Sequence, residues 1–355
     1  MKGNYPQIQE SIAARKPIQG LDFRHMTFDG ENFAKGMFIH CLFDGCTFKG
    51  CDLTKVHFVE CQMTECQFID NTFLSSKMTG SNLSHSQWQG DVIKLMVTDC
   101  SLSQSYWSSV NIQSCNFSLG DMNNALFEHS QWKTVACSKV EMKATKFDYM
   151  HFENVSWTDT DFTKLILNQC KFIRALLLKC DLSGLNFAGL SFHHCSCNNS
   201  RFVGTNFKQA QANNNNFSHS ELKNCDFREA ALTKSLFVES VLEDCDFSGS
   251  DVSHGKFSKA KLNACSFVNS DLTQSSFQHA TLDTVDFTES HLAYANLSYV
   301  SAIKCLFEKC TVQRTNIHAL VDEKCCWHGT DRKGLLVTDK TQQKIDTRLE
   351  PFMSR

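Results

Sequence analysis

Residues 23–48 read FRHMTFDGENFAKGMFIHCLFDGCTF, and a phenylalanine stands at every fifth position of this stretch. After a slip of one residue around Gly90–Val97, the same spacing of non-polar residues runs unbroken from Val97 to Ile317. Of the 29 phenylalanines, 28 lie in this register, and only Phe352 falls outside it. A period of five matches neither a helix, with 3.6 residues per turn, nor a strand, with two, so it predicts a repeat architecture.

A second register lies two residues before each large position and holds small or mid-sized residues, among them Cys41, Cys46, Cys51, Ser105, Ala125 and Cys170. A unit of five residues cannot bury its own large side chain, so it must stack on copies of itself. Four such units close a square coil of about 20 residues, and parallel coils lie about 4.8 Å apart. The pattern therefore predicts an all-β solenoid.

Several tripeptides resemble the consensus Ala-(Asp/Asn)-Leu-X-X of the pentapeptide-repeat family, including Cys51-Asp52-Leu53, Cys180-Asp181-Leu182, Cys225-Asp226-Phe227 and Ala295-Asn296-Leu297. This resemblance covers residues 21–318 and implies a right-handed quadrilateral parallel β-helix. The chain departs from the consensus by its many phenylalanines at the central position and cysteines before it, which changes the core volume more than the architecture. The family scaffold serves many tasks, so the fold alone indicates little about function.

The register predicts one repeat domain with two short caps. Residues 1–20 are polar and form the N-terminal cap, with a short helix near Gln9–Arg15. The β-helix spans 21–318, and the slip near 89–97 indicates a shortened coil or a bulge. Residues 319–355 form the C-terminal cap and tail, in which Asp339–Leu349 is expected to make an amphipathic helix over the last coil. Such ends prevent end-to-end stacking.

Nineteen cysteines raise the question of disulfides or metal binding. Most of them fall in the inward registers, Cys326 being the exception, so we expect buried free thiols. The first twenty residues contain no apolar signal core, which predicts a reducing, cytoplasmic environment. No apolar stretch approaches the length of a membrane span.

Three polar groups are candidates for ligand sites. In the segment 193–197 (HHCSC) both cysteines point inward and both histidines outward, which argues against a metal site. The segment 325–328 (CCWH) is expected to end the helix rather than to bind metal. Asn215, an inward amide, is expected to belong to a packed turn. The sequence thus predicts neither a metal nor a cofactor.

The formal net charge is only −3, but it is unevenly distributed. Residues 132–234 carry 13 basic and nine acidic side chains, whereas the repeats on both sides are acidic. This basic middle contains the one dense run of outward apolar residues, within the set Lys164, Ile166, Lys171, Ile173, Arg174, Leu176, Leu178 and Lys179. Exposed apolar surface rimmed with charge predicts a protein-binding site. The alternative is ordinary scattered surface residues.

The sequence contains no recognisable catalytic motif. It has no Gly-X-Ser-X-Gly elbow, and Gly249–Lys256 lacks the spacing of a phosphate loop. The leading hypothesis is therefore a non-catalytic bacterial scaffold that binds protein partners, with a homodimer left open and no direct binding of nucleic acid.

The family resemblance implies two sharper alternatives. Some members mimic duplex DNA and bind DNA gyrase, conferring quinolone resistance, but the basic middle disfavours that role. Others are effectors or accessory proteins of specialised secretion systems, exported without a classical signal peptide. A third alternative is a β-helical module of a larger enzyme complex.

Overall fold

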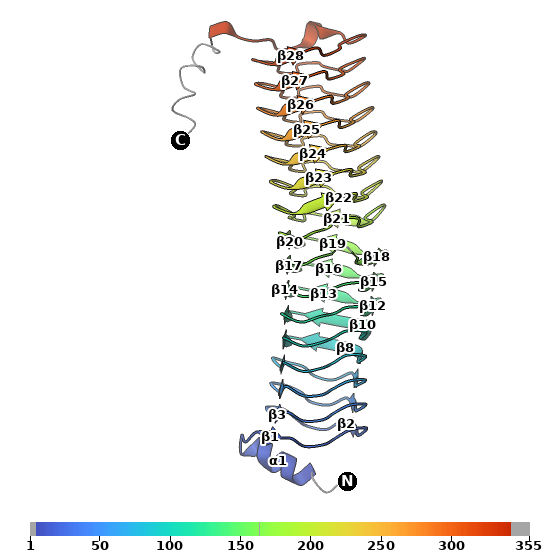
Figure 1. Cartoon of the computed structure of the whole chain (residues 1–355), viewed down its shortest axis with the longest axis vertical. Helices are drawn as coiled ribbons and strands as arrows, with labels where there is room; N and C mark the ends of the chain where they lie inside the picture. Colours follow the sequence, from blue (N-terminus) through green and yellow to red (C-terminus); the bar gives the residue numbers. More distant parts are fainter. Residues whose placement is uncertain (1–4, 163, 342–355) are drawn as a thin grey trace. The chain divides into compact units, whose positions relative to one another are not determined.

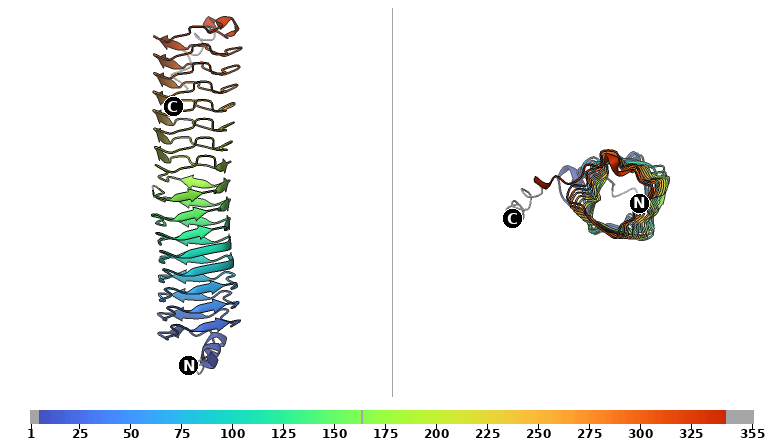
Figure 2. Two further views of the ribbon diagram at one scale, coloured as in Figure 1. Left: turned by 90° about the vertical axis from the view of Figure 1, so that its right-hand side faces the viewer. Right: turned by 90° about the horizontal axis from the view of Figure 1, so that it is seen from above.

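The computed structural model describes residues 5–162 and 164–341, and the chain forms two compact units, Met1–Leu185 and Asn186–Arg355. Each unit consists of parallel coils in which neighbouring chain segments pair 20 residues apart, for example Phe28 with Phe48 in unit 1 and Leu222 with Leu242 in unit 2. The predicted fold, a right-handed four-sided parallel β-helix, is confirmed (Figures 1 and 2).

Unit 1 begins with α1 (Tyr5–Ala13), which covers the first coil with its apolar side. Ile8 is buried, and the Gln9 side-chain amide donates a hydrogen bond to the backbone carbonyl of Asn32 at 2.7 Å. Burial of Ile8 removes apolar surface from water at the end where the solenoid has no further coil. The helix overlaps the predicted segment Gln9–Arg15 but starts earlier.

The coils of unit 1 build two sheets. The first contains β1 (Ile18–Gln19), β3 (Met37–Ile39), β5 (His57–Val59), β7 (Lys77–Thr79), β9 (Met96–Thr98), β11 (Asn116–Ser118), β14 (Ala136–Ser138), β17 (Ser156–Thr158) and β20 (Leu176–Leu178). The second contains β2 (Thr27–Asp29), β4 (Thr47–Lys49), β6 (Gln67–Ile69), β8 (Gln87–Ile93), β10 (Tyr106–Gln113), β13 (Gln131–Lys133), β16 (His151–Glu153) and β19 (Lys171–Ile173). It branches at β10 into β12 (Leu126–Glu128), β15 (Lys146–Asp148) and β18 (Ile166–Asn168).

The register slip lies at one corner of unit 1. Trp107 pairs with Trp88, but Val110 pairs with Gly90, so one side of the earlier coil is a residue short. Strands β8 and β10 run through this corner without interruption. Gly90 has φ +93°, and a Cβ there would lie 2.7 Å from a carboxylate oxygen of Asp70 and 3.1 Å from its Cα, so the short corner favours glycine.

Unit 2 contains β21 (Ser191–His193) and a seven-stranded sheet on one side of its coils. The strands of that sheet are β22 (Arg201–Val203), β23 (Glu221–Lys223), β24 (Val241–Glu243), β25 (Lys261–Asn263), β26 (Thr281–Asp283), β27 (Ser301–Ile303) and β28 (Val321–Glu323). Coil pairing continues as far as Asn316 with Leu336, and the short 3-10 helix η2 (Arg332–Gly334) precedes that point. The predicted helix Asp339–Leu349 lies outside the described residues beyond Thr341.

Side chains at the small inward position also donate hydrogen bonds to buried backbone carbonyls. The Cys46 thiol donates to the carbonyl of Phe23 at 2.8 Å, and the Thr145 hydroxyl donates to the carbonyl of Met122 at 2.6 Å. Each of these carbonyls belongs to the preceding coil, and both would otherwise lie in the core. Cysteine, serine and threonine therefore fill the corner and satisfy a buried acceptor together.

The cysteines lie where the registers predict. Seventeen of the nineteen are buried, which confirms the expected burial for these residues. Cys326 is partly exposed, and so is Cys325, which the register had placed inward. Asn215 is also fully buried. Its carbonyl accepts the backbone N–H of Cys195 at 2.7 Å, and its amide nitrogen donates to the carbonyls of Phe192 and Ala212. Its side chain is therefore part of the packed turn.

Candidate protein-binding surface

The eight predicted binding residues belong to one coil of unit 1. Lys164 and Ile166 stand before and at the start of β18, Lys171 and Ile173 begin and end β19, and Leu176 and Leu178 begin and end β20. Arg174 and Lys179 occupy the corner positions that follow β19 and β20, with φ of 53° and 54°. The set therefore forms a belt around three successive sides, which we call the 164–179 belt.

The belt has one compact apolar centre. Ile173 ends one side of the coil and Leu176 starts the next, so both flank the corner at Arg174 and are half-buried. Leu178, also half-buried, lies at the far end of β20, next to Lys179. Ile166 is 51% exposed but starts a different side. The structure thus brings Ile173 and Leu176 together and places Ile166 apart from them.

The basic residues of the belt differ in how they are held. The Arg174 guanidinium donates to Asn154 at 2.8 Å and forms an ion pair with Glu153, which fixes it against the preceding coil. Lys164, Lys171 and Lys179 are exposed, and none of them forms an ion pair with another described residue. Their ammonium groups remain available to a partner.

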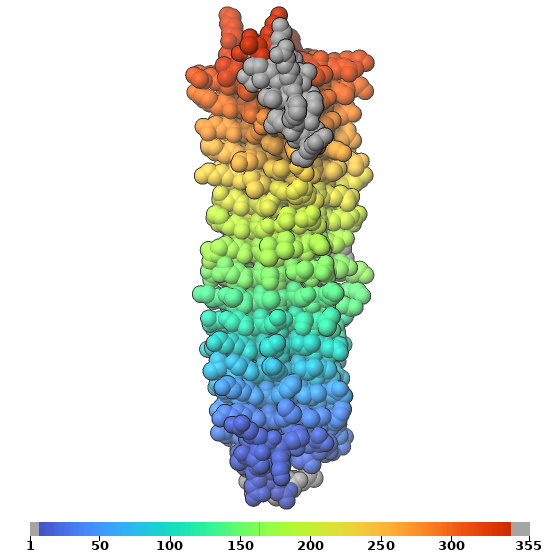
Figure 3. Space-filling model, turned by 90° about the vertical axis from the view of Figure 1, so that its left-hand side faces the viewer, coloured from blue at the N-terminus to red at the C-terminus, as the bar shows by residue number. Residues whose placement is uncertain are grey.

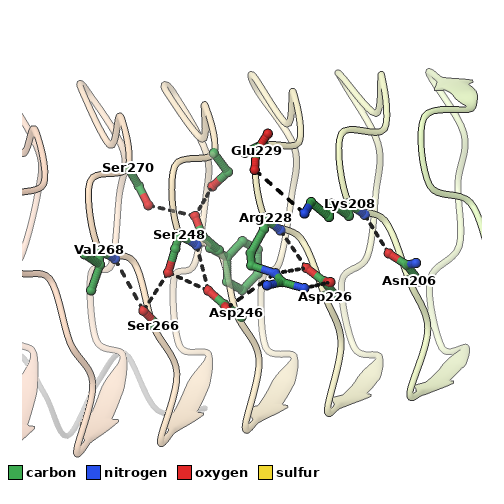
Figure 4. A network of polar contacts seen from close by, with 12 residues as sticks. Asn206, Lys208, Asp226, Arg228, Glu229, Asp246, Ser248, Ser266, Val268 and Ser270 are labelled. Atoms are coloured by element: carbon green, nitrogen blue, oxygen red, sulfur yellow. Dashed lines mark hydrogen bonds and ion pairs between the residues drawn. The ribbon is translucent and has the colours of Figure 1, made fainter.

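On one side of unit 2, by contrast with the unpaired lysines of the belt, charged and polar side chains pair with one another between coils (Figure 4). Arg228 binds Asp226 through two side-chain hydrogen bonds of 2.9 and 2.6 Å and lies 3.8 Å from Asp246 in the next coil. The Ser248 hydroxyl links Asp246 to Ser266. In this ladder the polar side chains satisfy one another between coils. These charged groups are already paired, so they are less available to a partner than the ammonium groups of the belt lysines.

The hydrogen bonds between Arg228 and Asp226 shift the pKa values of both side chains. The Arg228 guanidinium, by its hydrogen bonds, lowers the pKa of Asp226 below its ordinary value, although partial burial opposes the shift. Arg228 in turn has a raised pKa because it binds this carboxylate. The pair of Asp226 and Arg228 is therefore ionised at neutral pH.

The two larger hollows described on unit 1, around Gly120 and beside Tyr149, are open to solvent. Within each unit, the face visible in Figure 3 shows closely packed side chains and no deep hollow. In the segment 193–197 the two cysteines are buried while His193 and His194 face outward. Within residues 5–162 and 164–341, no three histidine, cysteine or acidic side chains gather as a possible metal site. In the same ranges no helix is long and apolar enough to cross a membrane.

One surface feature escaped the sequence reasoning. Two corner residues of unit 1, His129 and Tyr149, stack with ring centroids 5.0 Å apart and border a shallow groove. The signal was present in the sequence, because both aromatic residues occupy the same corner position 20 residues apart. The belt was predicted from outward basic and aliphatic residues, and a search for those residue types does not detect an aromatic pair.

The chain matches two family models. That of the "Pentapeptide repeat region" matches residues 240–317, and that of "Pentapeptide repeats (8 copies)" matches 41–84 and 191–229. Among curated proteins, no sequence matches the chain.

Similar solved structures include full-length QnrB1, a plasmid-mediated fluoroquinolone resistance protein. It is 16% identical over 67% of this chain and 92% of its own, with a TM-score of 0.23. Another is HetL from the cyanobacterium Nostoc sp. strain PCC 7120, a pentapeptide repeat protein involved in the regulation of heterocyst differentiation. It is 15% identical over 70% of this chain and 90% of its own, with a TM-score of 0.19.

Proposed function

Because the chain belongs to the pentapeptide-repeat family, we propose that it is a non-catalytic scaffold that binds a protein partner through the 164–179 belt. The β-helix suits this task because hydrogen bonds to neighbouring coils hold each side of a coil in place. In β19, for example, the Lys171 amide donates to the carbonyl of Met150 at 2.9 Å. A preorganised surface loses little conformational entropy on binding.

The observation that carries the proposal is the combination of apolar and unpaired basic residues in one coil. Ile173 and Leu176 form a small apolar centre, and Lys171 and Lys179 lie beside it without ion-pair partners among the described residues. Interface cores exclude water around apolar anchors, while the charged rim selects the partner. A partner of this surface is expected to present apolar side chains surrounded by carboxylates.

Site-specific photocrosslinking tests the proposal. A photoreactive residue at position 176 should capture a partner in cells, and mass spectrometry should identify it. Replacing Ile173, Leu176 and Leu178 with serine should abolish binding of that purified partner. Changing Lys171 and Lys179 to glutamine should slow association, and the effect should diminish as added salt screens the charges.

Val241 provides the matched control, because it is an exposed aliphatic residue at the start of a strand in unit 2. A photoreactive residue at 241 should not capture the same protein, and Val241→Ser should leave binding unchanged. Capture at both positions, or unchanged binding by a folded triple variant, would show that the belt is ordinary surface. Capture of a second copy, supported by the mass in solution, would identify a homodimer instead.

The finer form of the proposal is an effector or accessory protein of a bacterial specialised secretion system that is made in the cytoplasm. The buried free thiols support synthesis in the cytoplasm, because they suit a reducing compartment. A secretion assay comparing intact and secretion-deficient cells tests it. The alternative of a gyrase-binding DNA mimic is disfavoured by the net positive charge of residues 132–234, since duplex DNA is uniformly negative. Strong inhibition of gyrase supercoiling would reverse this ranking.

A further inference from the structure

A shallow groove of about 470 Å³ runs beside a corner of unit 1. It is bordered by residues of three successive coils, namely Ser109 and Asn111, then His129 and Gln131, then Tyr149 and His151. The groove lies just after the shortened corner at Gly90, where β8 and β10 continue through the turn. The first of the three corners carries a small side chain, Ser109, whereas the next two carry the rings of His129 and Tyr149. This change in side-chain size leaves a step in the surface next to His129.

The rings provide a flat, exposed surface. His129 and Tyr149 stack with an angle of 15° between their planes, and Tyr149 is 55% exposed. Tyr149 covers one face of the imidazole. The corner on the other side belongs to Ser109, whose side chain is too small to cover the ring. A bound ring of similar size at that position would extend the existing stack.

Three polar residues that line the groove have side chains without a hydrogen-bond partner among the described residues. No side-chain hydrogen bond to another described residue involves Asn111, Gln131 or His151. Of the described residues that line the groove, none is aspartate, glutamate, lysine or arginine. A second hollow on unit 1, around Gly120, is lined instead by Asp99, Asp121, Lys139 and Glu141. A lining without aspartate, glutamate, lysine or arginine therefore distinguishes the groove at Tyr149 from this second hollow.

We infer that this groove binds a neutral saccharide. The C–H face of a sugar ring would pack on the rings of His129 and Tyr149. Its hydroxyl groups, which both donate and accept, would pair with the amides of Asn111 and Gln131 and with the His151 imidazole. A nucleic acid or another polyanion would require cationic residues that the lining lacks. A fully apolar ligand would desolvate the two amides without replacing their hydrogen bonds to water.

The test uses the full chain and four neutral probes, namely cellohexaose, maltohexaose, N-acetylchitohexaose and mannohexaose. Binding is measured by calorimetry, and the site by spectra of protein carrying carbon-13 histidine. We expect at least one probe to bind and to shift the ring signals of His129 and His151. Tyr149→Ala should weaken that binding about tenfold, which is the scale of one aromatic contact. Gln131→Ala should weaken it as well.

Tyr299→Ala is the matched control. Tyr299 is also a corner residue stacked on a histidine, His279, with centroids 4.8 Å apart, but its hydroxyl lies 3.1 Å from His318 Nε2. This variant should leave saccharide binding unchanged. The inference is overturned if no probe shifts the two histidine signals, or if Tyr149→Ala binds as well as the parent. It is also overturned if oligogalacturonate or oligothymidylate occupies the groove more tightly than every neutral probe.

Discussion

The rings of Phe227 and Phe247 stack nearly parallel across neighbouring coils of unit 2, with centroids 4.6 Å apart and planes 8° apart. Phe267 extends the column at 4.7 Å, and the rings of Phe237 and Phe257 meet Phe247 edge-on. Each ring is thus held by stacked rings above and below it and by edges from the opposite side. The large residues of the five-residue register therefore stabilise neighbouring coils together. Removing one ring would take away contacts with several coils.

Phe247→Ala should lower the free energy of unfolding by about 3–5 kcal/mol, since it leaves a cavity in a rigid column. Denaturant unfolding followed by circular dichroism measures the loss. Lys261→Ala, at an exposed position that starts β25, is the control and should change stability by less than about 0.5 kcal/mol. Equal losses in the two variants would contradict the assignment of inward and outward positions.

The glycine of the shortened corner makes a second prediction. In Gly90→Ala the new Cβ would lie 2.7 Å from a carboxylate oxygen of Asp70 and 3.1 Å from its Cα. Gly50→Ala is the matched control, because Gly50 also has a positive φ, +59°, but a Cβ at Gly50 would have no neighbouring atom within 4 Å. Gly50 shares its φ with many non-glycine corner residues of the chain, whereas the φ of +93° at Gly90 is less favourable for an L-residue. The difference between the variants therefore reports the contact with Asp70 together with this extra backbone strain.

We expect Gly90→Ala to be the less stable variant by about 1–3 kcal/mol, the usual cost of overpacking. Thermal and denaturant unfolding of both variants measure the difference. If Gly90→Ala is as stable as Gly50→Ala, the corner is able to relax, and the register slip does not depend on glycine.

The fold was predictable because every coil repeats the same five-residue pattern of large and small inward residues. A large residue every fifth position and a small one two residues before it leave few arrangements other than stacked square coils. Even local adjustments follow, since Trp157 pairs with Cys137 on one side and Leu177 on the other, as constant core volume requires. The right-handed winding of the coils was predicted from the family resemblance, because the spacing of residues does not determine handedness.

The surface was less predictable, because outward positions carry no period. The predicted set includes Ile166, which starts β18, whereas Ile173 and Leu176 flank the corner between β19 and β20. It also could not show which charges pair across coils, as Arg228 does with Asp246 while Lys171 does not. The division into two compact units after Leu185 has no signal in the register, which continues through that point.

The thiols make a third prediction. Native protein should react with a small thiol reagent at Cys326 first and at Cys325 more slowly, since desolvation raises the pKa of Cys325 to about 12. The other seventeen should react only after unfolding. Burial raises the pKa of Cys46 and Cys115 to about 11, which keeps them in the unreactive thiol form at neutral pH.

Mass spectrometry of the labelled protein, with and without denaturant, locates the modified positions. Cys326→Ser should remove the fast phase of labelling without altering the pattern after unfolding. Rapid modification of ten or more cysteines in folded protein would contradict the core assignment.

The ion pair between Asp226 and Arg228 makes the last prediction. The pKa of Asp226 is lowered because Arg228 binds its carboxylate, so the ionised form stabilises the folded state. A depressed pKa contributes stability that is complete above the ordinary aspartate value of about 3.9 and is lost as the pH falls through the folded value. In Arg228→Gln the pKa of Asp226 should rise, and this part of the acid destabilisation should disappear. Carboxyl carbon shifts measure the pKa, and urea unfolding at pH 7 and pH 3 measures the stability. If Asp226 in the parent titrates at or above about 3.9, the hydrogen bonds to Arg228 do not persist in solution.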